Sequence, residues 1–325
     1  MNLLERLGLA TVEADLGRLE TLLAESVVIG DEYLDSVTTH LIYAGGKRLR
    51  PMLAIASATG GAREATLDDL LGGVALELMH LASLYHDDVM DEADVRRSVD
   101  SVNARYGNLV AIVAGDYLMA RSAAIAADLG TEIAGLLART LAWLTRGQVS
   151  EVRTTYSIER SEADYFEAIE GKTASLMASS CRVGAITAGR DAREVEALTE
   201  FGRSLGVIFQ LRDDVMDLVA VDGELGKPAG QDLAEGIYTL PTLVALDDSA
   251  VGAELSELLG GPLDDDERER ARKMVVSTDG IAETLKVATE HVVIARQVAD
   301  ELSDTELARG FKSLATSLLE DLPRP

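Results

Sequence analysis

A five-residue motif, Asp-Asp-Val-Met-Asp, occurs twice in this sequence, at residues 87–91 and again at 213–217. Each copy ends an apolar stretch, so a need for solubility does not explain it. On a helix, residues i and i+4 lie on the same face, one turn apart. Two such acidic faces pointing at each other would repel unless hard divalent cations lay between them. The acidic candidates are Asp87, Asp88, Asp91, Asp213, Asp214 and Asp217. Because Mg²⁺ shares its coordination sphere with water and phosphate, the motifs predict magnesium together with a phosphate-bearing substrate.

A loop with three cations provides a candidate anion site. Residues 45–51 read Gly-Gly-Lys-Arg-Leu-Arg-Pro, so a flexible glycine pair precedes the cations and a proline can start a helix. Lys47 and Arg50 are three residues apart and can converge on one anion. Lysine acts as a point charge and arginine binds oxyanions through two nitrogens. In a chain of net charge −26, this local positive charge predicts a bound diphosphate.

Other candidate phosphate contacts are spread along the chain. Arg96 and Arg97 follow the first motif, where they can bind phosphate, balance the aspartates, or do both. Lys172 and Thr173 start an apolar segment, and a helix N-terminus attracts anions. For the remaining candidates, a phosphate contact and a purely structural role both stay open: Gln210, Lys227, His80 and His86.

The composition favours a single all-α domain over residues 1–325. Of the residues, 47% are hydrophobic, and no proline lies between Pro51 and Pro228. That span is rich in strong helix formers and has few helix breakers. Apolar periodicity predicts helices over 10–28, 30–44, 50–60, 66–90, 102–129, 131–157, 161–170, 172–189, 192–220, 239–248, 264–278, 279–303 and 304–321.

Charge, cysteine content and hydropathy limit the function classes. The acidic charge argues against nucleic-acid binding, which needs a basic surface. The one cysteine, Cys181, excludes an internal disulfide and fits a reducing compartment. The first 15 residues lack a signal-peptide pattern, and the uncharged runs 52–62 and 236–246 are shorter than the roughly 18 residues of a membrane span. We therefore expect a cytoplasmic protein without a transmembrane segment.

Taken together, these motifs resemble the trans-type (all-E) polyprenyl diphosphate synthases. The resemblance covers residues 40–245 in the family's order, and two aspartate motifs with the 45–51 loop make it specific. It implies an all-α fold around a deep central cavity, a homodimer, three Mg²⁺ ions per active site, and isopentenyl diphosphate and an allylic diphosphate as substrates. In such an enzyme, metal and cations stabilise the departing diphosphate, the isopentenyl double bond attacks the allylic cation, and a proton is lost.

The resemblance also implies a role for each candidate. The metal ligands would be Asp87, Asp91 and Asp213. The neighbouring acids would also be catalytic and would support the metal directly or through water: Asp88, Asp214 and Asp217. The allylic diphosphate contacts would be Arg96, Lys172, Thr173, Gln210 and Lys227, of which Lys172 is also counted as catalytic. Isopentenyl diphosphate would lie against Lys47, Arg50, His80 and Arg97. One position departs from the family, because Ile237 stands where a lysine often precedes Thr-Leu-Pro, which puts one phosphate contact in doubt.

The residues before the first motif bear on product length. Ser83 and Ala82 lie four and five residues before Asp87 and are small, whereas short-chain members often carry an aromatic plug there. Met79 and Leu76 are candidate floors one and two turns deeper. We expect a product in the heptaprenyl to decaprenyl range. The alternatives are a farnesyl or geranylgeranyl diphosphate synthase, a non-catalytic subunit of a heteromeric synthase, a class I terpene cyclase, and an HD-type phosphohydrolase.

Overall fold

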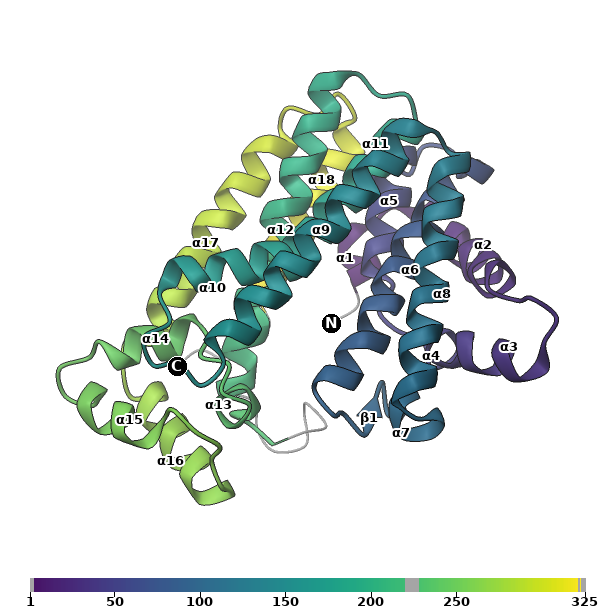
Figure 1. The fold of residues 1–325 in the computed structure, drawn as a ribbon. Coiled ribbons are helices and arrows are strands. Elements are labelled where there is room, and N and C mark those ends of the chain that lie inside the picture. Colours follow the sequence, from purple (N-terminus) through teal and green to yellow (C-terminus); the bar gives the residue numbers. More distant parts are fainter. Residues whose placement is uncertain (1–2, 220–227, 321, 323–325) are drawn as a thin grey trace.

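The computed structural model describes residues 3–219, 228–320 and 322, and this part of the chain is built almost entirely from helices (Figure 1). The all-α fold is thus confirmed. The elements are α1 (Leu3–Leu7), α2 (Ala10–Ser26), α3 (Glu32–Thr38), α4 (His40–Tyr43), α5 (Leu49–Thr59), α6 (Leu67–Met90), β1 (Val95–Arg96), β2 (Val99–Asp100), α7 (Val102–Tyr106), α8 (Asn108–Asp128), α9 (Thr131–Thr154), α10 (Glu162–Ile169), the π-helical turn η1 (Glu170–Ala174), α11 (Ser175–Thr187), α12 (Ala192–Val219), α13 (Gln231–Ala234), α14 (Leu240–Leu246), α15 (Gly252–Leu258), α16 (Asp265–Val276), α17 (Gly280–Ala299) and α18 (Thr305–Glu320).

Several helices begin where the sequence supplies a capping residue. The predicted capping box of Ser161 with Asp164 is confirmed at the start of α10. Thr66 and Asp69 form the same reciprocal arrangement at the start of α6. Each box satisfies backbone N–H groups that have no partner within the helix, so the two helices that flank the site start at defined residues.

Some predicted helix limits are wrong. The helix expected over 30–44 is divided into α3 and α4 at Thr39, and the one expected over 102–129 is divided into α7 and α8 at Gly107. Gly107 has φ +86°, a conformation that favours glycine and cannot continue a helix. The short helices α13 and α15 were not predicted, because apolar periodicity needs a window longer than either of them.

Two helix pairs face each other across the molecule. In Figure 1, α6 and α8 lie on one side and α9 and α12 on the other, with α11 joining them at one end. Helix α6 packs along α8, and α11 packs against α5, α6, α9 and α12. The first aspartate motif ends α6 and the second lies in the last turns of α12, so the fold presents both motifs from opposite walls.

Candidate active site

A polar cavity of about 290 Å³ lies between the two aspartate motifs. The first motif and the hairpin after it contribute Asp91 and Arg96, and α12 contributes Gln210 and Asp214. The remaining lining residues are Glu151, Arg160, Tyr165, Ile169, Lys172, Thr173, Asp232, Ile237 and Thr239. The structure therefore brings members of both motifs to one cavity, together with the predicted Lys172 and Thr173.

Asp214 is held in a buried hydrogen-bond network. The Tyr165 hydroxyl donates to its Oδ2, and Gln210 Nε2 donates to its Oδ1 at 2.9 Å. Thr173 Oγ1 in turn donates to Gln210 Oε1 at 2.8 Å, which connects η1 to α12. Burial raises the pKa of the Asp214 carboxyl to about 7, although both hydrogen bonds lower it. Asp214 therefore organises the wall of the cavity.

The other two acids of the second motif differ in exposure. Asp213 is exposed and can bind a cation from solvent. Asp217 is buried, and its Oδ2 accepts a hydrogen bond from the backbone N–H of Asp232 at 3.2 Å, which fixes the start of α13. Lys227, the remaining predicted phosphate contact on this side, lies outside the described residues.

Asp88, in the first motif, is fully buried and pairs with Arg96. Its Oδ1 accepts a hydrogen bond from Arg96 Nε at 2.6 Å, and Arg96 Nη2 lies 2.6 Å from the same oxygen in an ion pair. Its Oδ2 is buried and has no hydrogen-bond partner among the described residues. Arg96 therefore balances the charge of the first motif and also lines the polar cavity. Charge balance and phosphate binding, the two roles that the sequence left open, are compatible.

Burial opposes ionisation of Asp87 and Asp91, the two acids that lie one helical turn apart in the first motif. Burial raises the pKa of Asp87 to about 6; Lys172 lowers it and Asp91 raises it further. Burial also raises the pKa of Asp91. No cluster of three His, Cys, Asp or Glu side chains in residues 3–219, 228–320 and 322 forms a ready-made metal site. Asp87 and Asp91, at the C-terminal end of α6, are a donor pair that fits a hard divalent cation whose shell is completed by water and diphosphate.

Lys172 and Thr173 lie on η1, which close helix packing holds in place. A Cβ on Gly147 of α9 would lie 2.8 Å from the backbone N of Lys172, and one on Gly206 of α12 would lie 2.4 Å from Ala174 Cα. Glycine at both positions therefore lets α9 and α12 approach the turn from either side. Lys172 Nζ forms an ion pair with Glu151 of α9, a partner that sequence reasoning missed. Single π turns inside helices occur frequently at functional sites.

The predicted cationic loop contains a buried arginine that shapes it. Arg48 has φ +45°, and its guanidinium pairs with Glu20 and, at 2.8 Å, with Glu77. Arg97 Nη1 donates to the carbonyl oxygens of Leu41, at 2.9 Å, and Gly45. Arg48 and Arg97 thus fix the loop, and Glu77 is a second partner that sequence reasoning missed.

The cations around this loop form a candidate site for a second anion. Burial lowers the pKa of His80 well below its usual range, and Arg50 and Arg97 add to that effect, so His80 is neutral. Burial lowers the pKa of Arg50 to about 10, and its buried Nε has no partner in the described part of the chain. Lys47 Nζ lies 5.6 Å from the ring centre of Phe209 on α12, which places the loop beside the second motif's helix.

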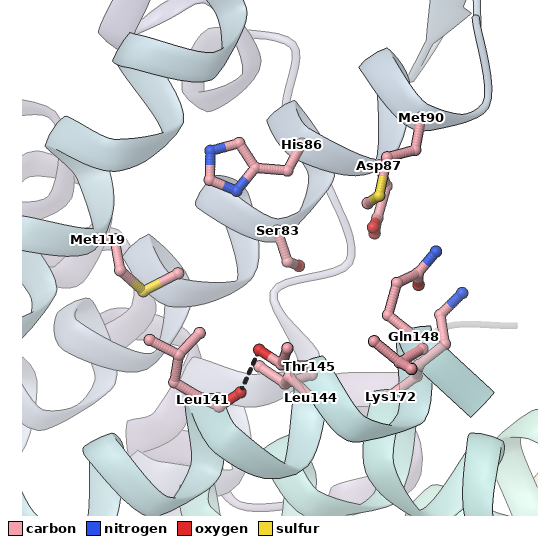
Figure 2. Close-up of a pocket in the computed structure, with 11 residues that line it drawn as sticks. Ser83, His86, Asp87, Met90, Met119, Leu141, Leu144, Thr145, Gln148 and Lys172 are labelled. Atoms are coloured by element: carbon pink, nitrogen blue, oxygen red, sulfur yellow. Dashed lines mark hydrogen bonds between the residues drawn. The ribbon is translucent and has the colours of Figure 1, made fainter. Parts of the chain in front are cut away.

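An apolar pocket of about 260 Å³ adjoins Asp87 (Figure 2). Figure 2 shows Gln148 and Lys172 pointing toward Asp87, with Ser83 deeper along α6. The lining residues are Ser83, His86, Asp87 and Met90 of α6, Met119 of α8, Leu141, Leu144, Thr145, Gln148 and Val149 of α9, and Lys172. Lys172 lines this pocket and the polar cavity alike, so the two spaces meet at its side chain.

The chain-length candidates occupy different places. Ser83 lines the apolar pocket, whereas Ala82 and Met79 are 0% and 3% exposed, belong to the packed core and do not line the pocket. His86 Nε2 lies 3.2 Å from the carbonyl oxygen of Ile112 and 3.5 Å from Asp116 Oδ1, both on α8. His86 therefore contacts α8 and also lines the apolar pocket.

One helix in the described part of the chain has the length and apolarity of a membrane span, namely α8. Packed core helices pass the same test, and 39% of its most apolar window is buried here. Its outer face exposes Leu109, Ile112 and Val113. The expected absence of a transmembrane segment stays a prediction.

Comparison with known proteins gives consistent results. The profile of the polyprenyl synthetase family matches residues 31–277. The chain is 38% identical to the nonaprenyl diphosphate synthase of Mycobacterium tuberculosis over 94% of its length and 92% of that protein's. It is 37% identical to heptaprenyl diphosphate synthase component 2 of Geobacillus stearothermophilus, over 93% and 92% of the two chains. The crystal structure of a Caulobacter crescentus polyprenyl synthase, complexed with calcium and isoprenyl diphosphate, superimposes with a TM-score of 0.90 at 30% identity and covers 97% of each chain.

Proposed function

Because the chain belongs to the polyprenyl synthetase family, we infer that it is a prenyltransferase that condenses isopentenyl diphosphate with an allylic diphosphate. One observation supports this most directly. A polar cavity that holds residues of both aspartate motifs meets an apolar pocket at Lys172. An allylic diphosphate has the same division, with a charged head and an apolar tail. The charged head would therefore lie between the two aspartate motifs, and the apolar tail would lie between α6, α8 and α9.

We propose that Mg²⁺ ions bind at Asp87, Asp91 and Asp213, three per active site. The raised pKa values of Asp87 and Asp91 support this, because burial opposes ionisation of both carboxylates and a bound cation would favour it. When bound there, the metal would supply positive charge that stabilises the negative charge developing on the leaving diphosphate. Calcium in the crystals of the Caulobacter relative is in keeping with a divalent-cation site.

The chain's own residues then act on the head group and on the tail. Lys172, Arg96, Thr173 and Gln210 orient the allylic diphosphate from the cavity walls. The cationic loop holds isopentenyl diphosphate, with neutral His80 as a hydrogen-bonding group. The apolar pocket excludes water from the allylic cation. We propose that the released diphosphate accepts the proton.

We propose a product of heptaprenyl to decaprenyl length, which the nonaprenyl and heptaprenyl relatives and the small Ser83 support. The test is incubation of purified protein with Mg²⁺, isopentenyl diphosphate and farnesyl or geranylgeranyl diphosphate, followed by product sizing. Elongation to 35 carbons or more is expected. Products of 15 or 20 carbons would instead identify a short-chain synthase. Turnover of the allylic substrate without isopentenyl diphosphate would identify a terpene cyclase.

We further propose that two copies of the chain associate through α8. Leu109, Ile112 and Val113 are 77%, 42% and 55% exposed, and their spacing places them on one helix face. A mass of twice 34.6 kDa by light scattering is expected. Since one relative is component 2 of a synthase, turnover by the purified chain alone also tests whether a second subunit is needed.

We also propose a cytoplasmic location, which the single buried cysteine supports. Recovery of the protein in the soluble fraction of lysed cells is expected. Recovery in the membrane fraction after a high-salt wash would contradict it.

A further inference from the structure

A buried arginine that no motif singled out lines the polar cavity. Arg160 immediately precedes the capping residue of α10 and is 5% exposed. It shares the cavity wall with Lys172, Asp214 and Ile237. Its Nη1 donates to the carbonyl oxygen of Tyr238 at 3.1 Å. Its Nε and Nη2 are buried and have no hydrogen-bond partner among the described residues.

Within the part of the chain that the structure describes, Arg160 forms no ion pair. The guanidinium carbon lies 5.7 Å from the ring centre of Tyr165. Burial lowers its pKa, while the nearby charges of Glu151 and Asp214 act in the opposite direction. Burying an unpaired charge is unfavourable for folding. A buried guanidinium with two unpaired N–H groups beside a polar cavity is suited to binding an anion in that cavity.

We propose that Arg160 is a further ligand of the allylic diphosphate at the second aspartate motif. This rests on the proposed function, because it takes the polar cavity as the diphosphate site. The neighbouring Ile237 brings no charge to that wall, so Arg160 would add a third cation to Arg96 and Lys172, which line the same cavity. Since Nε and Nη2 have almost no accessible surface, the guanidinium must turn from Tyr165 toward the cavity when the diphosphate binds.

The test is the affinity of the full-length protein for inorganic pyrophosphate with Mg²⁺, measured by titration calorimetry. Arg160→Met is expected to bind at least 10-fold more weakly than the wild type, and Arg160→Lys three- to fivefold more weakly, because lysine keeps the charge but not the two-nitrogen geometry. The matched control is Arg153→Met, an exposed arginine in the last turn of α9, which should stay within twofold of the wild type.

A second substitution in the same cavity distinguishes the loss of the positive charge of Arg160 from a loss of its packing. Ile237 lines the same cavity, so Arg160→Met combined with Ile237→Lys should recover at least threefold of the lost affinity. Wild-type affinity in Arg160→Met, or no recovery in the double variant, overturns the proposal. If Arg160→Met fails to fold by circular dichroism, the Arg160→Lys variant decides, and unchanged affinity there overturns the proposal.

The proposed function is tested separately by prenyl transfer in the wild-type protein. A wild type that binds pyrophosphate but does not elongate farnesyl diphosphate refutes the proposed function. The effect of Arg160 on pyrophosphate affinity is measured in either case, so the two results are independent.

Discussion

Replacing Ser83 with phenylalanine should shorten the product. Ser83 lines the apolar pocket four residues before Asp87 on α6. At 1.5 Å per residue this is about 6 Å along the helix, close to the roughly 5 Å of one extended isoprene unit. A ring at position 83 would therefore close the pocket about one unit below the diphosphate site. Products at least three isoprene units shorter than those of the wild type are expected.

The assay is extraction of the prenyl products, removal of phosphate and sizing by mass spectrometry at fixed ratios of the two substrates. Ala82→Phe is the matched control, because Ala82 is 0% exposed and does not line the pocket. Overpacking of that kind typically costs about 1–3 kcal/mol of stability. We therefore expect Ala82→Phe to lower the thermal midpoint and leave the product length unchanged.

The opposite pattern would refute this reasoning. Full-length product from Ser83→Phe, with shortened product from Ala82→Phe, would place the tail along the core face of α6. The length of α6 sets a further limit. It has 24 residues, about 36 Å, whereas nine isoprene units extend to about 45 Å. A nonaprenyl tail would therefore have to bend or continue past the end of α6.

Three further outcomes follow from packing and charge. Gly206→Ala should lower turnover at least 10-fold, because the new Cβ would lie 2.4 Å from Ala174 Cα and displace η1; Gly17→Ala, with no atom within 4 Å, should retain full activity. Cys181 is fully buried, and burial raises its thiol pKa to about 12, so a thiol reagent should modify it only after unfolding. Asp214 keeps its proton up to about pH 7 when folded and loses it near 3.8 when unfolded, so stability in EDTA should fall as pH rises between these values. Asp214→Asn should remove up to about 4 kcal/mol of that fall between pH 4 and pH 8, as measured by urea denaturation; an unchanged slope would contradict the assignment.

The parts of the site that the sequence predicted are those with local spacing. The aspartates recur at i and i+4, and the cations of the 45–51 loop are adjacent, so a helix or a turn alone brings them together. Their arrival at one cavity needed the resemblance to a family, because α6 and α12 are far apart in sequence. The π-helical geometry at Lys172 could not be predicted, since it depends on how closely α9 and α12 pack against the turn.

The missed residues act through partners distant in the chain. Tyr165 donates to a carboxylate 49 residues away, Glu77 pairs with an arginine 29 residues away, and Glu151 pairs with a lysine 21 residues away. A lone tyrosine or glutamate on an amphipathic helix gives no local signal of such a role. Only the burial of each group and the identity of its partner reveal it, and both are properties of the assembled fold.

The same burial makes the substrate-free site electrostatically unfavourable. The raised pKa values of Asp87 and Asp214 show that the folded chain opposes ionisation of both carboxylates, while Arg160 is held nearby without an ion pair to any described residue. Magnesium and diphosphate would supply the missing cations for the acids and the missing anion for the arginine. Binding would then relieve both penalties together, because a ligand that binds only the folded state adds to its stability. The thermal midpoint should therefore rise more with Mg²⁺ and pyrophosphate together than the sum of the rises with each alone. A purely additive response would show that the two charge sets are not linked.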